Sequence, residues 1–295
     1  MHGFLNINKP TGMTSFDVIR KIRQIIPRGV KIGHLGTLDP MASGVLPIAL
    51  GKATRIIPYI EDEKKSYIAE LTLGAISDTQ DAWGQITYTG NTKFAVEDLQ
   101  AILKQFSGTI KQIPPMYSAV HHQGKRLYEY AREGISVTRR EREINIYSLQ
   151  VLKIDKNSAL PVIKLKIDCS RGTYIRTLCN DIGAQLGTGG LMSSLVRIYS
   201  GGFNIEQACP LEKIANNKLY LKQHLMPLDY PLQSIPAISI DSWQDIRDVM
   251  NGRAITLANK NVHGLLRLYN PEGKLIALAR NTGDQGTIKP ERVFK

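Results

Sequence analysis

Cysteine, histidine and long apolar runs are scarce in this sequence. Its three cysteines, Cys169, Cys179 and Cys209, form no CxxC pair, which argues against a zinc knuckle, a redox dithiol and a disulfide framework. The six histidines include no HExxH motif, so a metal enzyme is not indicated. No segment approaches the about 18 apolar residues of a membrane helix, and the N-terminus does not resemble a signal peptide. We therefore expect a cytoplasmic protein without a metal or a membrane segment.

Acidic residues are outnumbered by basic ones. Lysine and arginine total 38 against 26 aspartates and glutamates, and the formal charge is +12. Such a charge attracts polyanions, of which nucleic acid is the commonest large one in the cytosol. Residues 124–142 combine Tyr128 and Tyr130 with a concentration of cations: Lys125, Arg126, Arg132, Arg139, Arg140 and Arg142. This combination suits RNA, and a solvated basic face without a specific ligand is the alternative.

The apolar pattern predicts strands and helices that do not alternate regularly. Strands are expected over 4–8, 67–73, 142–154 and 162–169, and helices over 96–106 and 173–186. A first helix is expected to begin at Thr14 or Ser15, with an apolar face made of Phe16, Ile19, Ile22 and Ile26.

The character of the chain changes after about residue 232. A short helix over 242–250 is followed by short strands over 265–269 and 274–280. We therefore expect two domains, a mixed one over 1–232 and a small β-rich one over 233–295.

The most unusual segment is GHLGTLDPMASGVL, residues 33–46. Pro40 restricts Asp39 to extended conformations, and Gly36 and Gly44 allow the backbone to turn closely around it. The segment therefore holds one carboxylate on a loop beside a site. A turn aspartate that caps a helix is the alternative interpretation.

Three further motifs accompany the aspartate loop: NKPTGMTS at 8–15, KKSY at 64–67 and SRGTYIRTL at 170–178. In this order and spacing, the four motifs resemble the TruB-type tRNA pseudouridine-55 synthases of bacteria over roughly residues 1–230. Residues 77–84 and 114–119 fit the same family. We therefore identify the chain as similar to this family.

The resemblance implies an α+β fold, with a mixed, largely antiparallel sheet flanked by helices and a C-terminal PUA-like RNA-binding domain. It also implies a monomeric enzyme that isomerises one uridine in the T loop of tRNA, without a cofactor. The sequence contains no Walker A motif and no GxGxxG after a strand, which agrees with that expectation.

Three residues match the family's catalytic positions. Asp39 is the nucleophile or base, and Arg176 pairs with it; an opposite charge lowers a carboxyl pKa, which would keep Asp39 ionised. The resemblance implies that Tyr67 stacks on the target base and helps to remove its C5 proton. Whether Asp39 adds to the pyrimidine ring, attacks C1′ or forms a glycal stays open.

Other matching residues are assigned to substrate binding. Because the uridine must be extracted from a folded loop, His34 is expected to enter the T loop and fill the vacated space. Leu195 packs on the base, Lys9 lies near phosphate or structural carboxylates, and Tyr174 contacts the substrate. The T-stem backbone is expected to contact a group of basic residues, Lys125, Arg126 and Arg139.

Three other functions compete with this interpretation. A non-catalytic RNA-binding or tRNA-folding protein would share the basic face but would not need an ionised Asp39. A methyltransferase would need a cofactor pocket that no motif indicates. A related synthase acting on another RNA would share the aspartate loop, but the motifs at 8–15 and 170–178 favour the T-loop type.

Overall fold

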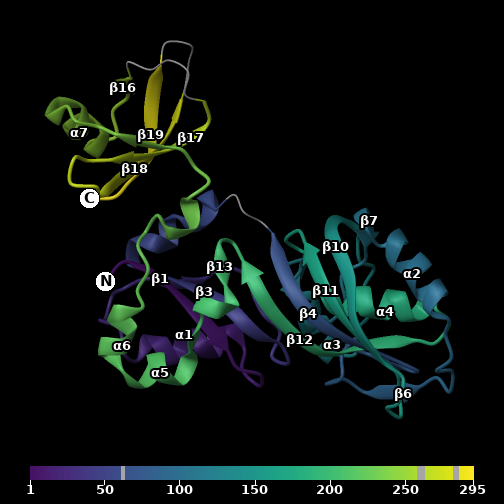
Figure 1. Ribbon diagram of the computed structural model, residues 1–295. Coiled ribbons are helices and arrows are strands. Elements are labelled where there is room, and N and C mark those ends of the chain that lie inside the picture. The colour runs from purple at the N-terminus through teal and green to yellow at the C-terminus, as the bar shows by residue number, and fades with distance from the viewer. Residues whose placement is uncertain (61–63, 258–262, 282–285) are drawn as a thin grey trace.

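The computed structural model describes residues 1–60, 64–257, 263–281 and 286–295. These residues form a ten-stranded sheet, a five-stranded sheet and two short hairpins (Figure 1). Within the described ranges, no helix combines the length and the hydropathy of a membrane span.

The large sheet has the strand order β14-β1-β3-β12-β4-β11-β10-β7, with β2 beside β3 and β13 beside β12. Its strands are β1 (Gly3–Lys9), β2 (Ile32–His34), β3 (Ser43–Leu50), β4 (Lys65–Leu73), β7 (Gly108–Gln112), β10 (Arg142–Asp155), β11 (Val162–Cys169), β12 (Gly190–Ser200), β13 (Phe203–Asn204) and β14 (Cys209–Pro210). Most pairs are antiparallel, and the exceptions are β1 with β14 and β3 with β12. This confirms the expected mixed, largely antiparallel α+β fold.

The centre of the large sheet is its least regular part. Strands β3 and β12 pair in parallel through only two registered positions, Val196 with Ser43 and Arg197 with Gly44. A Cβ on Gly44 would lie 2.2 Å from the carbonyl oxygen of Arg197, and the φ of Gly44 is +102°. Only glycine therefore allows the two strands to approach this closely.

The helices are α1 (Ser15–Arg23), α2 (Val96–Gln105), α3 (Leu127–Arg132), α4 (Ile175–Gln185), α5 (Leu211–Asn216), α6 (Lys218–Gln223) and α7 (Trp243–Met250). Short 3₁₀ turns are η1 (Gly51–Arg55), η2 (Ile57–Tyr59), η3 (Ile205–Gln207) and η4 (Tyr230–Leu232).

Helix α1 corrects one prediction. Thr14 caps it, and the Thr14 side chain and Asp17 form a capping box. The buried face is Ser15, Val18 and Ile22, a stripe at helical spacing, whereas Phe16 is 65% exposed. Phe16 lies one residue, or about 100° around the helix, from this stripe, so it does not belong to the apolar face.

Helix α4 is buried on an unusually large part of its circumference. Its buried residues include the apolar Leu178 and Ile182, but also Arg176 and Thr177. A Cβ on Gly183 would lie 2.3 Å from the backbone nitrogen of Gly190, so the helix packs directly on the start of β12. Arg176, in the first turn of α4, belongs to the buried part of the helix.

The second sheet has the order β15-β17-β18-β19-β16 and is flanked by α7. Its strands are β15 (Ala237–Ser239), β16 (Ile255–Thr256), β17 (Leu265–Tyr269), β18 (Leu275–Asn281) and β19 (Thr287–Val293). It projects beyond the β1–β3 end of the large sheet (Figure 1). Leu278 and Phe294 share one buried cluster with Phe4 and Ala49, so the small sheet packs on the large one through apolar side chains. The domain boundary at residue 232 stays a prediction.

Two hairpins stand apart from these sheets. One is formed by β5 (Ala75–Ser77) with β6 (Ile86–Tyr88), and the other by β8 (His121–His122) with β9 (Lys125–Arg126). Strand β9 and helix α3 lie in the predicted basic segment, and β8 directly precedes it.

Candidate active site

The aspartate loop connects β2 to β3 and is held by the motif at residues 8–15. The backbone nitrogen of Leu38 donates to Ser15 Oγ over 2.9 Å, and Gly12 N donates to the Pro40 carbonyl over 2.9 Å. Lys9 Nζ donates to the carbonyls of Pro10, Met13 and Pro40 over 2.9, 2.7 and 3.4 Å. The first motif and the aspartate loop are therefore one structural unit.

These contacts argue against the phosphate contact expected for Lys9, whereas the other expectation, a place near a structural carboxylate, agrees with the effect of Asp39 on its pKa. Its side chain is fully buried, and its ammonium group is surrounded by backbone carbonyls beneath the loop. Burial lowers the pKa of Lys9 to about 8, although Asp39 acts in the opposite direction. Lys9 positions the loop from below and does not present a cation to an RNA phosphate.

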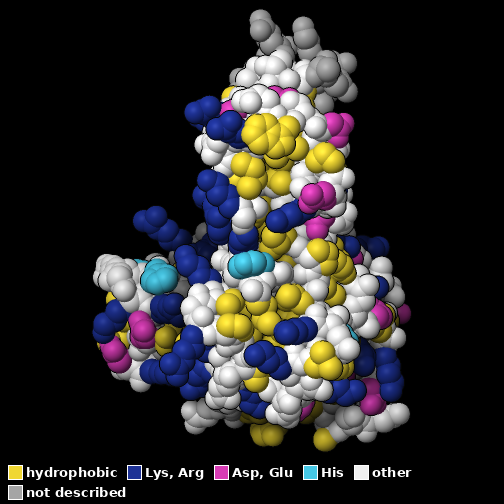
Figure 2. Space-filling model, turned by 90° about the vertical axis from the view of Figure 1, so that its left-hand side faces the viewer, with side chains coloured by type: hydrophobic (Ala, Val, Ile, Leu, Met, Phe, Trp, Pro, Cys, Tyr) yellow, Lys and Arg dark blue, Asp and Glu magenta, His cyan; other side chains and the backbone are white. Residues whose placement is uncertain are grey.

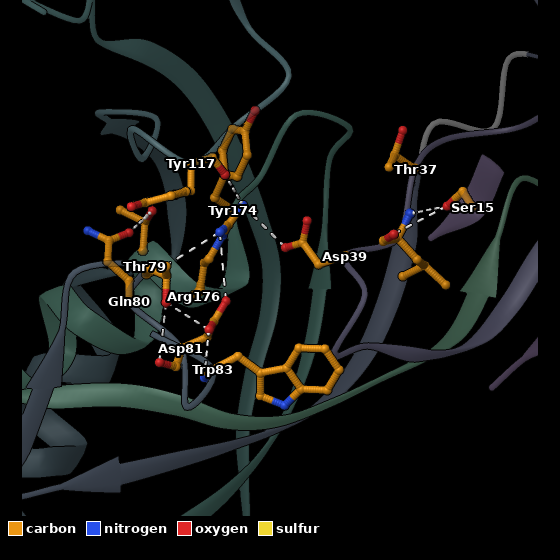
Figure 3. A network of polar contacts seen from close by, with 12 residues as sticks. Ser15, Thr37, Asp39, Thr79, Gln80, Asp81, Trp83, Tyr117, Tyr174 and Arg176 are labelled. Carbon is orange, nitrogen blue, oxygen red and sulfur yellow. Dashed lines mark hydrogen bonds and ion pairs between the residues drawn. The ribbon is translucent and has the colours of Figure 1, made fainter. Parts of the chain in front are cut away.

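Arg176 brings four segments of the chain together (Figure 3). Its Nη2 lies 3.3 Å from Asp39 Oδ2, and its Nη1 lies 3.7 Å from Asp81 Oδ2. Nη2 also donates to the Tyr117 carbonyl over 2.6 Å and Nη1 to the Thr79 carbonyl over 3.5 Å. The predicted pairing of Asp39 with Arg176 is present, and Asp81 is a second carboxylate that was not predicted.

The electrostatics of Asp39 differ from the prediction. Burial raises the pKa of Asp39 and Asp81 raises it further, whereas Arg176 and Lys9 lower it. The net direction is upward because the desolvation of the carboxyl outweighs its cationic neighbours. The Asp39 side chain is nevertheless 35% exposed, so its carboxylate remains open to a ligand.

Tyr67 and Leu195 form an apolar wall on neighbouring strands. In the β4–β12 pair, Tyr67 is registered with Arg197 and Ala69 with Leu195, so both side chains face the same side of the sheet. Each is only 6% exposed. Burial raises the pKa of Tyr67 to about 12, so its hydroxyl is neutral at pH 7.

Arg197 is a site residue that the sequence analysis missed. It is fully buried, and its guanidinium donates to the carbonyls of Val45, Thr37 and Gly36 over 2.7, 3.2 and 3.1 Å. It also hydrogen-bonds the Tyr67 hydroxyl. Arg197 therefore fastens the aspartate loop to the strand that carries Tyr67. The sequence signal that could have indicated Arg197 was its position shortly after Leu195, a predicted site residue, near the end of the strand. In the structure this position lies opposite Gly44.

His34 and Tyr174 flank this arrangement. His34 lies at the end of β2, and burial together with the nearby Arg197 lowers its pKa, which favours the neutral imidazole. Tyr174 directly precedes α4, and its backbone exchanges hydrogen bonds with the Gln112 side chain over 2.8 and 3.1 Å. Its ring centroid is 5.9 Å from the Arg176 guanidinium.

The basic segment forms a separate surface. Lys125 pairs with Glu133 over 3.2 Å and Arg126 is exposed, whereas Arg139 donates to the Pro114 carbonyl over 3.0 Å. A cavity of about 400 Å³ is lined by three arginines together with polar and apolar residues: Pro114, Val120, His121, His122, Gln123, Leu127, Thr138, Arg139, Arg140 and Arg142. Tyr117, which precedes this segment in the chain, accepts from Arg176, and Arg176 also contacts Asp39 on the aspartate loop.

Among the residues with described positions, no group of three or more acidic, histidine or cysteine side chains could hold a metal ion. The three cysteines are buried thiols.

Known proteins resemble the chain over its whole length. Residues 22–175 match the model for the N-terminal domain of TruB family pseudouridylate synthases, and residues 176–233 match a C-terminal domain of tRNA pseudouridylate synthase B. A tRNA pseudouridine synthase B of Syntrophomonas wolfei is 54% identical over 297 residues, which cover 100% of this chain and 99% of that protein. The corresponding protein of Clostridium kluyveri is 42% identical over 285 residues, which cover 95% of this chain and 96% of that protein.

The fold also matches a solved structure. A chain in the crystal structure of a Cbf5–Nop10–Gar1 complex has a TM-score of 0.71 and 26% identity, with 99% of this chain and 85% of that chain covered. Full-length identity above one half, together with the family model, shows that the chain belongs to the TruB family of pseudouridylate synthases and is an isomerase.

Proposed function

We propose that this enzyme converts uridine 55 in the T loop of tRNA to pseudouridine, with Asp39 as the group that acts on the base–ribose link. The observation that carries the proposal is the Asp39–Arg176 contact of 3.3 Å, in which the arginine is buried and the carboxylate remains partly exposed. The names of the similar proteins, tRNA pseudouridine synthase B, support tRNA as the substrate.

The reaction needs no external reactant. The N1–C1′ bond of the nucleoside breaks, a C5–C1′ bond forms, and the proton lost at C5 is balanced by a proton gained at N1. Asp39 must be ionised to act as nucleophile or base. Arg176 favours that form and fixes the carboxylate, because one of its nitrogens contacts Asp39 while the other is held by Asp81.

Tyr67 and Leu195 are proposed to hold the extruded base beside the carboxylate. Tyr67 offers an aromatic face and Leu195 an aliphatic one, on adjacent strands. Burial raises the pKa of Tyr67 to about 12, so its phenol is neutral at pH 7 in the free enzyme. We therefore assign positioning of the base to Tyr67 ahead of proton removal.

The remaining assignments concern the capture of the RNA. His34, uncharged in its half-buried position, is proposed to occupy space vacated by the extruded nucleotide. Tyr174 is proposed to contact the substrate beside Arg176, and Lys125, Arg126 and Arg139 to contact phosphates of the T stem. The small domain is proposed to extend the contact to other parts of the tRNA. The expectation of a monomer stays a prediction.

Release of tritium from tRNA labelled at C5 of uridine tests the function directly. Purified enzyme should release tritium without any added cofactor, and mapping should place the pseudouridine at position 55. A transcript with cytidine at position 55 should release none. Product at another uridine would contradict the proposed position.

The Asp39→Asn variant tests the assigned residue. We expect tritium release to fall by at least about 10³-fold, because an amide cannot act as nucleophile or base, while the Kd for tRNA stays within about threefold. Wild-type protein and the variant would be compared by the same filter-binding titration. Substantial turnover by Asp39→Asn would exclude this aspartate as the catalytic group. Wild-type protein that binds tRNA without turnover would instead favour a non-catalytic RNA-binding function.

A further inference from the structure

Trp83 lies on the turn that also carries Asp81, outside the wall formed by Tyr67 and Leu195. Its side chain is 57% exposed. A single exposed aromatic residue needs no functional explanation by itself. Trp83 differs from the other exposed aromatic side chains in two features: its connection to Asp39 and the hydrogen bonds that hold its turn.

Three successive contacts connect Trp83 to the candidate catalytic carboxylate. The backbone nitrogen of Trp83 donates to Asp81 Oδ1 over 3.0 Å, and Asp81 Oδ2 lies 3.7 Å from Arg176 Nη1. Arg176 Nη2 in turn lies 3.3 Å from Asp39 Oδ2. In the view of Figure 3, the indole extends from the turn on the Asp39 side of Arg176.

The turn that carries Trp83 is firmly held. Ala82 N donates to the Met192 carbonyl over 3.0 Å, which attaches the turn to β12, the strand of Leu195. Asp81 Oδ1 also accepts from Thr79 Oγ1 over 2.8 Å. A Cβ on Gly84 would lie 2.2 Å from Asp78 Oδ1 and 2.3 Å from Thr79 Oγ1, so the turn is closely packed. Trp83 is thus an exposed aromatic side chain on a fixed support.

An aromatic ring in this setting suits a nucleobase. Each base has a π-face, and stacking on tryptophan needs no hydrogen-bond partner and no fixed sequence. When one nucleotide leaves a stacked loop, its neighbours lose a stacking partner, and a protein aromatic side chain can replace it. The reacting base is proposed to lie against the wall of Tyr67 and Leu195 beside Asp39. Trp83 lies on a separate turn and is 57% exposed, so it is available to a different base.

We infer that Trp83 is a stacking platform for a nucleobase of the substrate RNA that neighbours the extruded uridine. This inference rests on the proposed function and adds a second base-binding position to it. Stacking here stabilises the opened loop, so Trp83 is a binding residue for RNA and takes no part in bond making or breaking.

Steady-state kinetics on a synthetic T stem-loop RNA test the inference. We expect Trp83→Ala to raise KM by about 5- to 100-fold, and Trp83→Phe to keep most of the affinity because it retains an aromatic face. Trp243→Ala is the matched control, since Trp243 is 71% exposed and lies on α7, beside the small sheet. An unchanged KM in Trp83→Ala would overturn the inference.

Fluorescence provides a readout that does not depend on turnover or on the folding of the alanine variant. The chain contains only two tryptophans, Trp83 and Trp243. In a Trp243→Phe protein, saturating T stem-loop RNA should quench Trp83 emission by about half or more, whereas in Trp83→Phe the emission of Trp243 should stay nearly constant. Unquenched Trp83 at saturating RNA would contradict the inference.

The two proposals fail in different ways. If the wild type forms pseudouridine 55 but Trp83 emission and the KM of Trp83→Ala do not change, only the stacking platform is refuted. If the wild type forms no pseudouridine in the same RNA, the proposed function fails.

Discussion

At the scale of single residues, opposing electrostatic effects act on the carboxylate of Asp39. Burial and Asp81 favour the neutral acid, whereas Arg176 and Lys9 favour the ion. The net pKa lies above the ordinary value of an aspartic acid, so activity that requires the ion falls as the pH drops through this raised pKa. The acid limb of the pH–rate profile therefore begins at a higher pH than it would for an exposed aspartate.

The Asp81→Asn substitution tests this account of Asp39. Removing the negative charge of Asp81 should lower the pKa of Asp39, so the acid limb of kcat/KM should move to lower pH. This shift is expected even if the maximal rate falls because Arg176 loses one of its partners. Kinetics between pH 4 and 8 on C5-tritiated tRNA would measure the shift. Glu272→Gln, an exposed acidic residue in the turn before β18, should leave the limb in place. A shift to higher pH in Asp81→Asn would contradict the assignment.

At the scale of elements, the site depends on the short parallel junction of β3 with β12. Arg197 on β12 donates to carbonyls of the aspartate loop and contacts Tyr67 on β4. Helix α4 packs on the start of β12 and brings Arg176 to the other side of the same loop. The loop is therefore fixed by two arginines that approach it from different elements.

The Gly44→Ala substitution tests the importance of this junction. The new Cβ would lie 2.2 Å from the Arg197 carbonyl oxygen, so β3 and β12 must separate. We expect a loss of at least about 3 kcal/mol in the free energy of unfolding, measured by urea denaturation, from overpacking added to backbone strain. The control is Gly12→Ala, whose φ is also positive but whose Cβ would meet no atom within 4 Å. Equal losses in the two variants would show that strain alone, and not the junction, is responsible.

At the scale of the whole molecule, the positive charge is spread over more than the candidate active site. Figure 2 shows Lys and Arg side chains along one margin of the molecule, from the projecting small sheet down to the body. The net charge of +12 gives a field that attracts a polyanion before specific contacts form. We propose that phosphate contacts then position the RNA, while the surface beside Asp39 selects the base.

Salt dependence measures these phosphate contacts. The affinity for a T stem-loop RNA should fall linearly with rising salt on a double-logarithmic plot, because bound cations are released from the RNA. Arg126→Gln should reduce the magnitude of the slope by about 1, since one exposed cation is removed from the basic segment. Lys274→Gln, an exposed cation beside β18, should not change it. Equal slopes for all three proteins would exclude Arg126 from phosphate contact.

The sequence by itself determined the elements whose signal is local. Alternating apolar residues predicted β4 and β11, and a cap at Thr14 or Ser15 predicted the start of α1. Glycine and proline around Asp39 predicted an aspartate on a constrained loop. The four motifs also indicated the family, because each keeps its residues within a short stretch of chain. Local preferences and spacing are properties of neighbouring residues, so they can be read without the fold.

Only the tertiary structure decided which distant groups share one environment. It placed Lys9 beneath the loop, Asp81 beside Arg176, Arg197 under Gly36 and Thr37, and Trp83 on the same turn as Asp81. It also reversed the expected direction of the pKa of Asp39, because the cost of burying a charge depends on every atom packed around it. Burial and long-range contact are set by the packing of whole elements, and no segment carries that information alone.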